Sequence, residues 1–218
     1  VIPKQGNKLI VADLSQIELR LCAHISQDRG FLRAFTDWKC RSCGATGAAD
    51  VILHYCPKCN EFENEHAGFW HGLDLHQQTT DLIPALNGNR QYGKTANFAL
   101  IYGASAKRMA SEYSDLSIAG WQDVIDQYMQ TYQGIHLWHL RMQRELYDKG
   151  ECRDVFGRKR RITKQAISRN FKHALNQFVN FPVQSSACAL IELSMVKLRE
   201  HWQDTGEWGR DIVPTNFV

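Results

Sequence analysis

The first part of the chain combines an apolar run with an amphipathic pattern. Residues 9–12 are all apolar, which predicts a short buried strand. Directly after it, Ile17 and Leu21 recur at helical spacing and predict a helix with one buried face. Ser15 precedes that helix and can cap it. The pattern therefore predicts a strand followed at once by a helix, with a carboxylate, Asp13, at the end of the strand.

Helical periodicity also dominates the rest of the chain. The predicted helices cover residues 74 or 75 to 83, 90 to about 102, 117 to 132, 135 to 148 and 183 to 202. Pro182 suits the first turn of the last helix, and we expect Ile191 and Leu198 to lie on its buried side. A hairpin is predicted for residues 151–163, with its turn at Gly157. The pattern indicates an α+β fold in which helices predominate.

Composition and charge narrow the class of protein. A chain of 218 residues, 44% hydrophobic and 22% charged, suits a globular protein with a substantial core. No apolar run approaches the roughly 20 residues that a membrane span needs, so we expect no membrane partner. The net charge of +3 is too small to indicate nucleic-acid binding by itself. The chain begins at Val1 without Met, and we expect it to be a piece of a longer protein.

Four of the seven cysteines form two pairs with metal-site spacing. Cys40 and Cys43, then Cys56 and Cys59, are CxxC pairs separated by twelve residues, which is zinc-ribbon spacing. Four thiolates close a tetrahedral site, so we expect a structural zinc ion there. The alternative is four unrelated reduced cysteines. Zinc-bound thiolates and free thiols are both typical of a reducing compartment, whereas a disulfide framework is not.

One helix carries the most specific polar pattern. Arg90, Lys94, Phe98 and Tyr102 follow one another at intervals of four residues, which places them along one stripe. A stripe facing the core would be apolar. Two cations followed by two aromatic rings suit a nucleoside triphosphate instead, with phosphates on the cations and sugar and base against the rings. The alternative is a solvated, partly amphipathic helix. Gly103 fits the C-terminus of this helix.

Cations also gather on the predicted hairpin. Arg158, Lys159, Arg160 and Arg161 are consecutive and can form a local phosphate-binding surface. The alternative is that this run of charge is simply a solvated face.

Three further polar positions each have two interpretations. Asp13 can bind a metal ion at a sheet edge, or it can serve as a cap or turn residue. Asn180 and Gln184 lie near the start of the last predicted helix, where each can cap the helix or touch a ligand.

Taken in order, these segments resemble the motifs of the family A DNA polymerases, the group that includes bacterial DNA polymerase I and many phage replicative enzymes. Residues 13–20, DLSQIELR, resemble the first palm motif, and residues 90–103 resemble the fingers-helix motif RxxxKxxxFxxxYG. Three shorter motifs of the family are resembled by residues 74–76, 156–160 and 180–186. Five motifs in order are more specific than any one, and they span nearly the whole chain outside the cysteine segment.

The resemblance implies a template-directed DNA polymerase that uses primer–template DNA, deoxynucleoside triphosphates and two Mg²⁺ ions. It implies that Asp13 binds the catalytic metal ions and that Glu18 selects against ribose. The implied contacts to the rest of the nucleotide are His76, Arg90, Lys94, Phe98 and Tyr102. The implied contacts to DNA are Arg158, Lys159, Arg160, Asn180 and Gln184.

The same resemblance divides the chain into four parts. Residues 1–38 would belong to a palm, 39–72 to a zinc-ribbon-like insertion, 73–170 to the fingers with the basic hairpin, and 171–218 to a palm truncated before its last catalytic motif. The expected fold is a mostly helical fingers subdomain joined to a partial antiparallel-sheet palm. The family's second metal-binding carboxylate, in a His-Asp-Glu motif, is expected after residue 218, so we expect this piece alone to be inactive.

Two other functions compete with the polymerase. A polymerase-derived module could keep the zinc ribbon and bind nucleic acid without catalysis. A zinc-stabilised α/β protein of unrelated function would require the ordered motifs to be coincidental. A His-Asp-Glu motif directly after residue 218 in the parent gene would favour the polymerase over the non-catalytic module. The zinc-ribbon-like insertion is not a general family feature, and the sequence leaves three alternatives for what it touches: DNA, a replication protein, or nothing. We expect the protein in the cytoplasm of a bacterium or of a phage-infected host.

Overall fold

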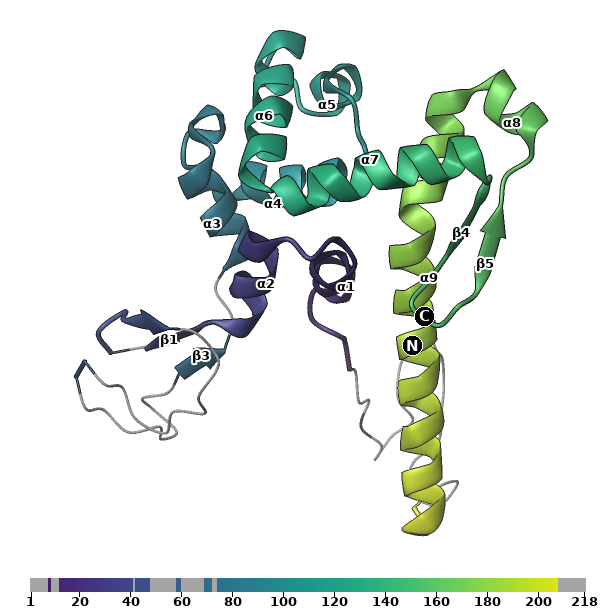
Figure 1. The fold of residues 1–218 in the computed structure, drawn as a ribbon. Coiled ribbons are helices and arrows are strands. Elements are labelled where there is room, and N and C mark those ends of the chain that lie inside the picture. The colour runs from purple at the N-terminus through teal and green to yellow at the C-terminus, as the bar shows by residue number, and fades with distance from the viewer. Residues whose placement is uncertain are drawn as a thin grey trace.

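The computed structural model describes residues 8, 12–40, 42–47, 58–59, 69–71 and 74–207, and of residues 39 and 69–71 it describes the backbone alone. The described residues form mainly helices, together with two small antiparallel sheets (Figure 1). The helices are α1 (Ile17–Ser26), α2 (Arg29–Thr36), α3 (Leu75–Leu82), the 3₁₀ turn η1 (Pro84–Leu86), α4 (Arg90–Leu100), α5 (Ala106–Glu112), α6 (Ile118–Thr131), α7 (Gln133–Asp148), α8 (Lys164–Arg169) and α9 (Phe171–Asp204). The strands are β1 (Trp38–Cys40), β2 (Thr46–Gly47), β3 (Phe69–His71), β4 (Glu151–Arg153) and β5 (Lys159–Arg161).

The core is built where helices from both halves of the chain meet. Helix α1 packs against α2, α7 and α9, and α7 runs across the molecule from α6 towards α9 (Figure 1). Large aromatic side chains fill this junction because each of them removes much apolar surface from water. The largest fully buried aromatic side chains are Trp121, Trp138, Tyr128, Tyr132, Phe31 and Phe178.

A buried carboxylate joins the corner between α1 and α2 to the start of α7. Asp28 caps α2 by accepting the N–H of Phe31 at 3.1 Å, and its other oxygen accepts the N–H of Gly134 at 2.8 Å. A Cβ on Gly134 would lie 2.5 Å from the Cα of Asp28, so no side chain fits there. Gly134 lies inside the first turn of α7, because this helix begins at Gln133, two residues before its predicted start.

The two small sheets lie at different places along the chain. In the first sheet, β1 pairs with both β2 and β3, and Trp38 lies opposite Gly47 on one side and His71 on the other. In the second sheet, β4 pairs with β5, which confirms the predicted hairpin. Gly157 lies in its turn with a φ of 84°. The strand predicted at residues 9–12 falls almost wholly outside the described residues.

Helix α9 differs most from the sequence prediction. It begins at Phe171 and passes through Pro182, where the sequence predicted the helix to start. Proline has no N–H to donate to the carbonyl of Phe178, four residues earlier. The thiol of Cys152 in β4 lies 3.6 Å from that carbonyl oxygen and donates to it. The hairpin therefore supplies a donor for the carbonyl that Pro182 leaves without its helical partner.

Two smaller expectations about helices were also wrong. Ser15 does not cap α1; the N-cap is Gln16, in a left-handed conformation and without a side-chain cap. Ile191 and Leu198 are 37% and 43% exposed rather than buried. The buried positions of α9 end at Ala189, and Figure 1 shows the last turns of this helix extending beyond the other labelled helices.

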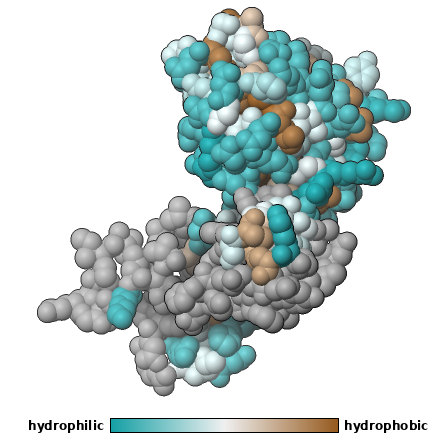
Figure 2. Space-filling model, turned by 90° about the vertical axis from the view of Figure 1, so that its left-hand side faces the viewer, coloured by the Kyte–Doolittle hydropathy of each residue, from teal (hydrophilic) through white to brown (hydrophobic). Residues whose placement is uncertain are grey.

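The described helices do not include one that is both long and apolar enough to cross a membrane. On the side drawn in Figure 2, the described surface is mostly hydrophilic, with small separate hydrophobic areas.

Candidate functional site

Helix α4 begins and ends at features present in the sequence. The side chain of Asn89 caps it by accepting the N–H of Gln91 at 2.9 Å. Gly103 follows its last turn with a φ of 73° and donates its N–H to the carbonyl of Leu100 at 3.0 Å. The predicted helix is therefore confirmed, with Arg90 in its first turn and Tyr102 just beyond its end.

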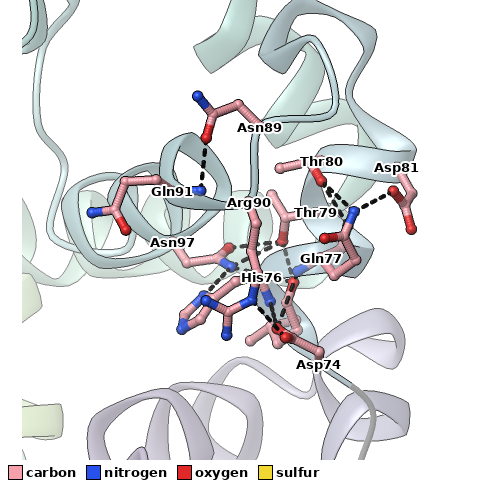
Figure 3. A network of polar contacts seen from close by, with 11 residues as sticks. Asp74, His76, Gln77, Thr79, Thr80, Asp81, Asn89, Arg90, Gln91 and Asn97 are labelled. Carbon is pink, nitrogen blue, oxygen red and sulfur yellow. Dashed lines mark hydrogen bonds and ion pairs between the residues drawn. The ribbon is translucent and has the colours of Figure 1, made fainter.

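Helices α3 and α4 approach each other closely at Gly93. A Cβ on Gly93 would lie 2.2 Å from the carbonyl oxygen of His76 and 2.7 Å from Cγ2 of Thr80. Glycine is required because no other residue allows the two backbones to come so near. This contact brings His76 of α3 beside the polar face of α4 (Figure 3).

Arg90 is oriented by Asp74, the residue that caps α3. The Nε of Arg90 lies 2.7 Å from one oxygen of Asp74, whose other oxygen accepts the N–H groups of His76 and Gln77 (Figure 3). Burial acts to raise the pKa of Asp74, but these hydrogen bonds outweigh it and hold the pKa below its usual value. Both side chains are about half exposed, so the pair positions Arg90 and adds little to the stability of the fold.

Lys94 and Phe98 face an open pocket of about 280 Å³. Lys94 is exposed, and within the described part of the chain it has no ion-pair partner. The ring of Phe98 also lies near the imidazole of His76, with 5.8 Å between centroids. The other residues lining the pocket are Gln91, Thr95, Ala99 and Tyr113. An unpaired cation, an aromatic ring and an imidazole thus share one region of the surface.

Tyr102 links the end of α4 to α1 and α9. Its hydroxyl donates to the carboxylate of Glu18 at 2.6 Å, and it also forms a hydrogen bond with the side chain of Gln184. Burial, and then the contact with Glu18, raises the pKa of Tyr102 well above its usual value, so the phenol stays protonated. Three of the residues predicted to lie at the site are therefore in direct contact.

Asp13 lies just before α1 and is exposed. The turn that starts this helix is closed by the N–H of Ile17, which donates to the carbonyl of Leu14 at 3.2 Å. Because Glu18 contacts Tyr102, this end of α1 is tied to the end of α4. The metal-binding role of Asp13 stays a prediction, although an exposed carboxylate has the oxygen donors that Mg²⁺ prefers.

The cations of the hairpin are not equally available to a ligand. Arg158 is bound to the buried carboxylate of Asp154 at 2.7 Å, and Lys159 lies 3.3 Å from Glu151. Arg161 also pairs with Glu151, at 2.9 Å. Five cations and two carboxylates lie between residues 151 and 161, so the hairpin remains positively charged.

Asp154 holds the hairpin against the middle of α9. Its carboxylate accepts the hydroxyl of Ser185 at 2.7 Å as well as the side chain and N–H of Arg158. Burial acts to raise the pKa of Asp154, but these donors outweigh it and keep the pKa low.

The cation of Arg160 has a different partner from that of Arg158. It donates to Gln177 at 3.0 Å and lies 6.0 Å from the centre of the Phe181 ring. Asn180 is partly buried, and its side-chain oxygen has no hydrogen-bond partner among the described residues.

Three of the four predicted zinc ligands converge. The sulfur atoms of Cys40, Cys43 and Cys59 all lie within 4.8 Å of one another, and those of Cys40 and Cys59 are 3.7 Å apart. Two thiolates at about 2.3 Å from one tetrahedral zinc ion are about 3.8 Å apart, so this spacing fits the metal. Gly44, with a φ of 70°, closes the turn between the first two cysteines. Cys56, the fourth predicted ligand, lies outside the described residues.

The family follows from comparison with known proteins. The model of DNA polymerase family A matches residues 1–212. The chain belongs to DNA polymerase family A. It is 30% identical over 201 residues to the thermostable DNA polymerase I of Thermus filiformis and 29% identical over 215 residues to the DNA polymerase I of Pseudomonas aeruginosa. These matches cover 90% and 97% of this family A chain but only 20% of each relative.

A solved structure of a polymerase domain has the same fold. The POL domain of Pol1 from M. smegmatis, in complex with a DNA primer-template and dNTP, matches 89% of this chain and 30% of that chain. The TM-score is 0.62 at 22% sequence identity, which supports the fold alone.

Two residues of the site were not predicted from the sequence. Asn97 is fully buried in α4 and contacts His76, and Tyr113 lines the pocket beside Lys94. Asn97 could have been noticed as a polar residue on the buried side of an amphipathic helix, since buried polar groups require partners. Tyr113 follows α5, and no local pattern places it beside α4.

Proposed function

We propose that the chain forms the nucleotide-binding part, and one metal-binding carboxylate, of a template-directed DNA polymerase. The observation that carries the proposal is the grouping of Phe98, His76 and Lys94, which has no ion-pair partner among the described residues, beside the oriented Arg90. In the reaction, the primer 3′-hydroxyl attacks the α-phosphorus of a deoxynucleoside triphosphate, a new P–O bond forms and pyrophosphate leaves. Mg²⁺, when bound, would neutralise charge on the phosphates and activate the attacking hydroxyl.

The proposed roles follow from charge and position. Arg90 and Lys94 would hold the β- and γ-phosphates, since guanidinium and ammonium groups both bind phosphate oxygens. Phe98 would pack against the sugar and base, and Tyr102 would lie near the templating base. Glu18, held by Tyr102, would crowd a ribose 2′-hydroxyl and so favour deoxynucleotides. Asn180 and Gln184 would touch the primer–template.

The relatives support this proposal without establishing it for the chain. They are called DNA polymerase I, and the solved neighbour was in complex with primer-template and dNTP. The chain spans about a fifth of the length of these relatives, with 20% of each covered, so polymerisation by the whole protein is part of the proposal. Such an enzyme would act in the cytoplasm, where its template is.

Primer extension tests the proposal. The protein, with residues 1–218 in their natural chain context, is incubated with a labelled primer–template and Mg²⁺. We expect extension that follows the template and requires the complementary deoxynucleotide. Binding of DNA without extension would instead favour a non-catalytic nucleic-acid-binding module, for which the cluster of Cys40, Cys43 and Cys59 is the specific support.

The cysteine cluster is proposed to bind one structural zinc ion, with Cys56 as fourth ligand. Elemental analysis of the reduced protein should give about one zinc per chain. Cys43→Ala should lower the zinc content sharply, because it removes one of three sulfurs already brought together. Cys188→Ala, at an exposed position of α9, is the matched control and should keep the metal. Equal zinc content in both variants would contradict the assignment.

The hairpin is proposed to contact duplex phosphates without reading bases. Replacing Lys159 by Ala should weaken DNA binding equally across sequences and flatten the dependence of log affinity on log salt by about 0.9 per lost contact.

A second variant, Arg158→Ala, should lower the melting temperature of the protein, because it leaves the buried Asp154 carboxylate without its cation. Binding and melting curves measured on both variants check this. An unchanged salt slope for Lys159→Ala would mean that this cation pairs with Glu151 and does not contact DNA.

A further inference from the structure

His76 is contacted from behind by a buried polar network (Figure 3). Its Nδ1 lies 3.1 Å from Nδ2 of Asn97, in the middle of α4. Asn97 has no exposed surface, and neither have Thr79 of α3 and Tyr132, the residue that precedes α7. Elements far apart in the sequence thus form one network, and Asn97 connects this network to the imidazole.

The orientation of the Asn97 amide follows from its other neighbours. Its Nδ2 lies 2.9 Å from Oγ1 of Thr79 and 3.4 Å from the carbonyl oxygen of Leu75. A carbonyl can only accept, so the group that faces it must be the amide NH₂ and not the amide oxygen. Thr79 donates to the same carbonyl at 2.8 Å and can accept from Asn97 and from Tyr132. The two amide hydrogens of Asn97 then go to its two nearer acceptors, Oγ1 of Thr79 and Nδ1 of His76, and the carbonyl of Leu75 at 3.4 Å is the more distant third.

A donor facing Nδ1 determines the tautomer of His76. Nδ1 must be unprotonated in order to accept from Asn97, so the neutral ring carries its proton on Nε2. Within the described part of the chain, Nε2 has no hydrogen-bond partner. Burial, with the nearby Arg90 and Lys94, lowers the pKa of His76, against the opposite effect of Asp74. The ring is therefore mainly neutral at pH 7.

We propose that Asn97 is a positioning residue that holds His76 neutral with its proton on Nε2, so that the ring offers one donor to the triphosphate of an incoming deoxynucleotide. This inference rests on the proposed function, in which His76 contacts that triphosphate. An uncharged donor suits this place because a third cation would be repelled by Arg90 and Lys94 before the phosphates arrive. The network behind the ring acts as outer-shell partners do for metal-binding histidines, by fixing tautomer and orientation.

Nitrogen-15 NMR of the histidine-labelled protein tests the inference without nucleotide or DNA. At pH 7.5 we expect His76 to show an unprotonated Nδ1 and a protonated Nε2. In Asn97→Asp the new carboxylate can only accept, so Nδ1 should become protonated and the pKa of His76 should rise by about one unit or more. Gln130→Glu adds the same charge at an exposed position of α6, outside the pocket, and should leave the tautomer unchanged.

The results separate this inference from the proposed function. A protonated Nδ1 in the wild-type protein would overturn it, and so would an unchanged His76 pKa in folded Asn97→Asp. If that variant does not fold, the wild-type tautomer decides alone. Adding dNTP and Mg²⁺ should then shift the Nε2 signal. The expected tautomer without any response to dNTP would support the role of Asn97 while contradicting the nucleotide contact of His76.

Discussion

Replacing Asp13 by Ala should reduce primer extension by at least about 1,000-fold. Loss of a metal-binding carboxylate removes several kcal/mol of transition-state stabilisation, and each 1.36 kcal/mol is a factor of ten in rate. The residue is exposed, so the variant should fold normally. Single-turnover extension at saturating dNTP, with circular dichroism as the check on folding, measures the effect.

Two further variants make the Asp13 result specific. Asp13→Asn keeps the size of the side chain and removes its charge, so it should be nearly as inactive as the alanine variant. Asp126→Ala removes an exposed carboxylate of α6 and should extend primers at the normal rate. Normal extension by folded Asp13→Ala would contradict the proposed metal site.

Lys94→Ala should lower the rate of nucleotide incorporation by about 100- to 1,000-fold. Loss of one donor aimed at charge that develops in the transition state costs about 2.7–4 kcal/mol in an oxyanion hole, and we expect a similar loss for an ammonium group aimed at the leaving pyrophosphate. Within the described part of the chain Lys94 has no ion-pair partner, so its removal leaves no buried charge behind and should not affect stability. Single-nucleotide incorporation over a range of dNTP concentrations separates the loss in kcat from a change in KM.

The control for Lys94 is another exposed lysine. Lys107→Ala, on α5, removes the same charge away from the pocket and should incorporate nucleotides normally. Lys94→Arg should recover part of the activity, since it keeps the cation but changes its shape. Unaltered kcat and KM in Lys94→Ala would exclude a phosphate contact.

Local signals were sufficient to predict most helices. Asn89 and Gly103 delimit α4, Ser117 caps α6, and the hairpin turns at Gly157, because caps and turns are decided by a few neighbouring residues. The stripe along α4 correctly placed Lys94 and Phe98 together on one face. Such features depend on spacing alone, which the sequence contains.

The remaining features depend on contacts between distant segments. Pro182 predicted a helix start because nothing local reveals that Cys152 donates to the carbonyl of Phe178. The run of cations in the hairpin did not show that Arg158 is bound to Asp154, since the burial of that carboxylate comes from packing against α9. The partner of His76 was missed for the same reason: Asn97 lies twenty-one residues further along the chain.

The close approach at Gly93 has a consequence for how a ligand would be bound. Because a Cβ there would lie 2.2 Å from the carbonyl oxygen of His76, the backbones of α3 and α4 are in direct contact, and the Asp74–Arg90 pair joins the starts of the same two helices. Together with the contact between Asn97 and His76, these contacts fix the positions of the helices that carry His76, Arg90 and Lys94. The backbone segments that carry the three groups need no mutual alignment when a ligand arrives. The conformational entropy of arranging them is lost during folding rather than during binding, which preorganises the site.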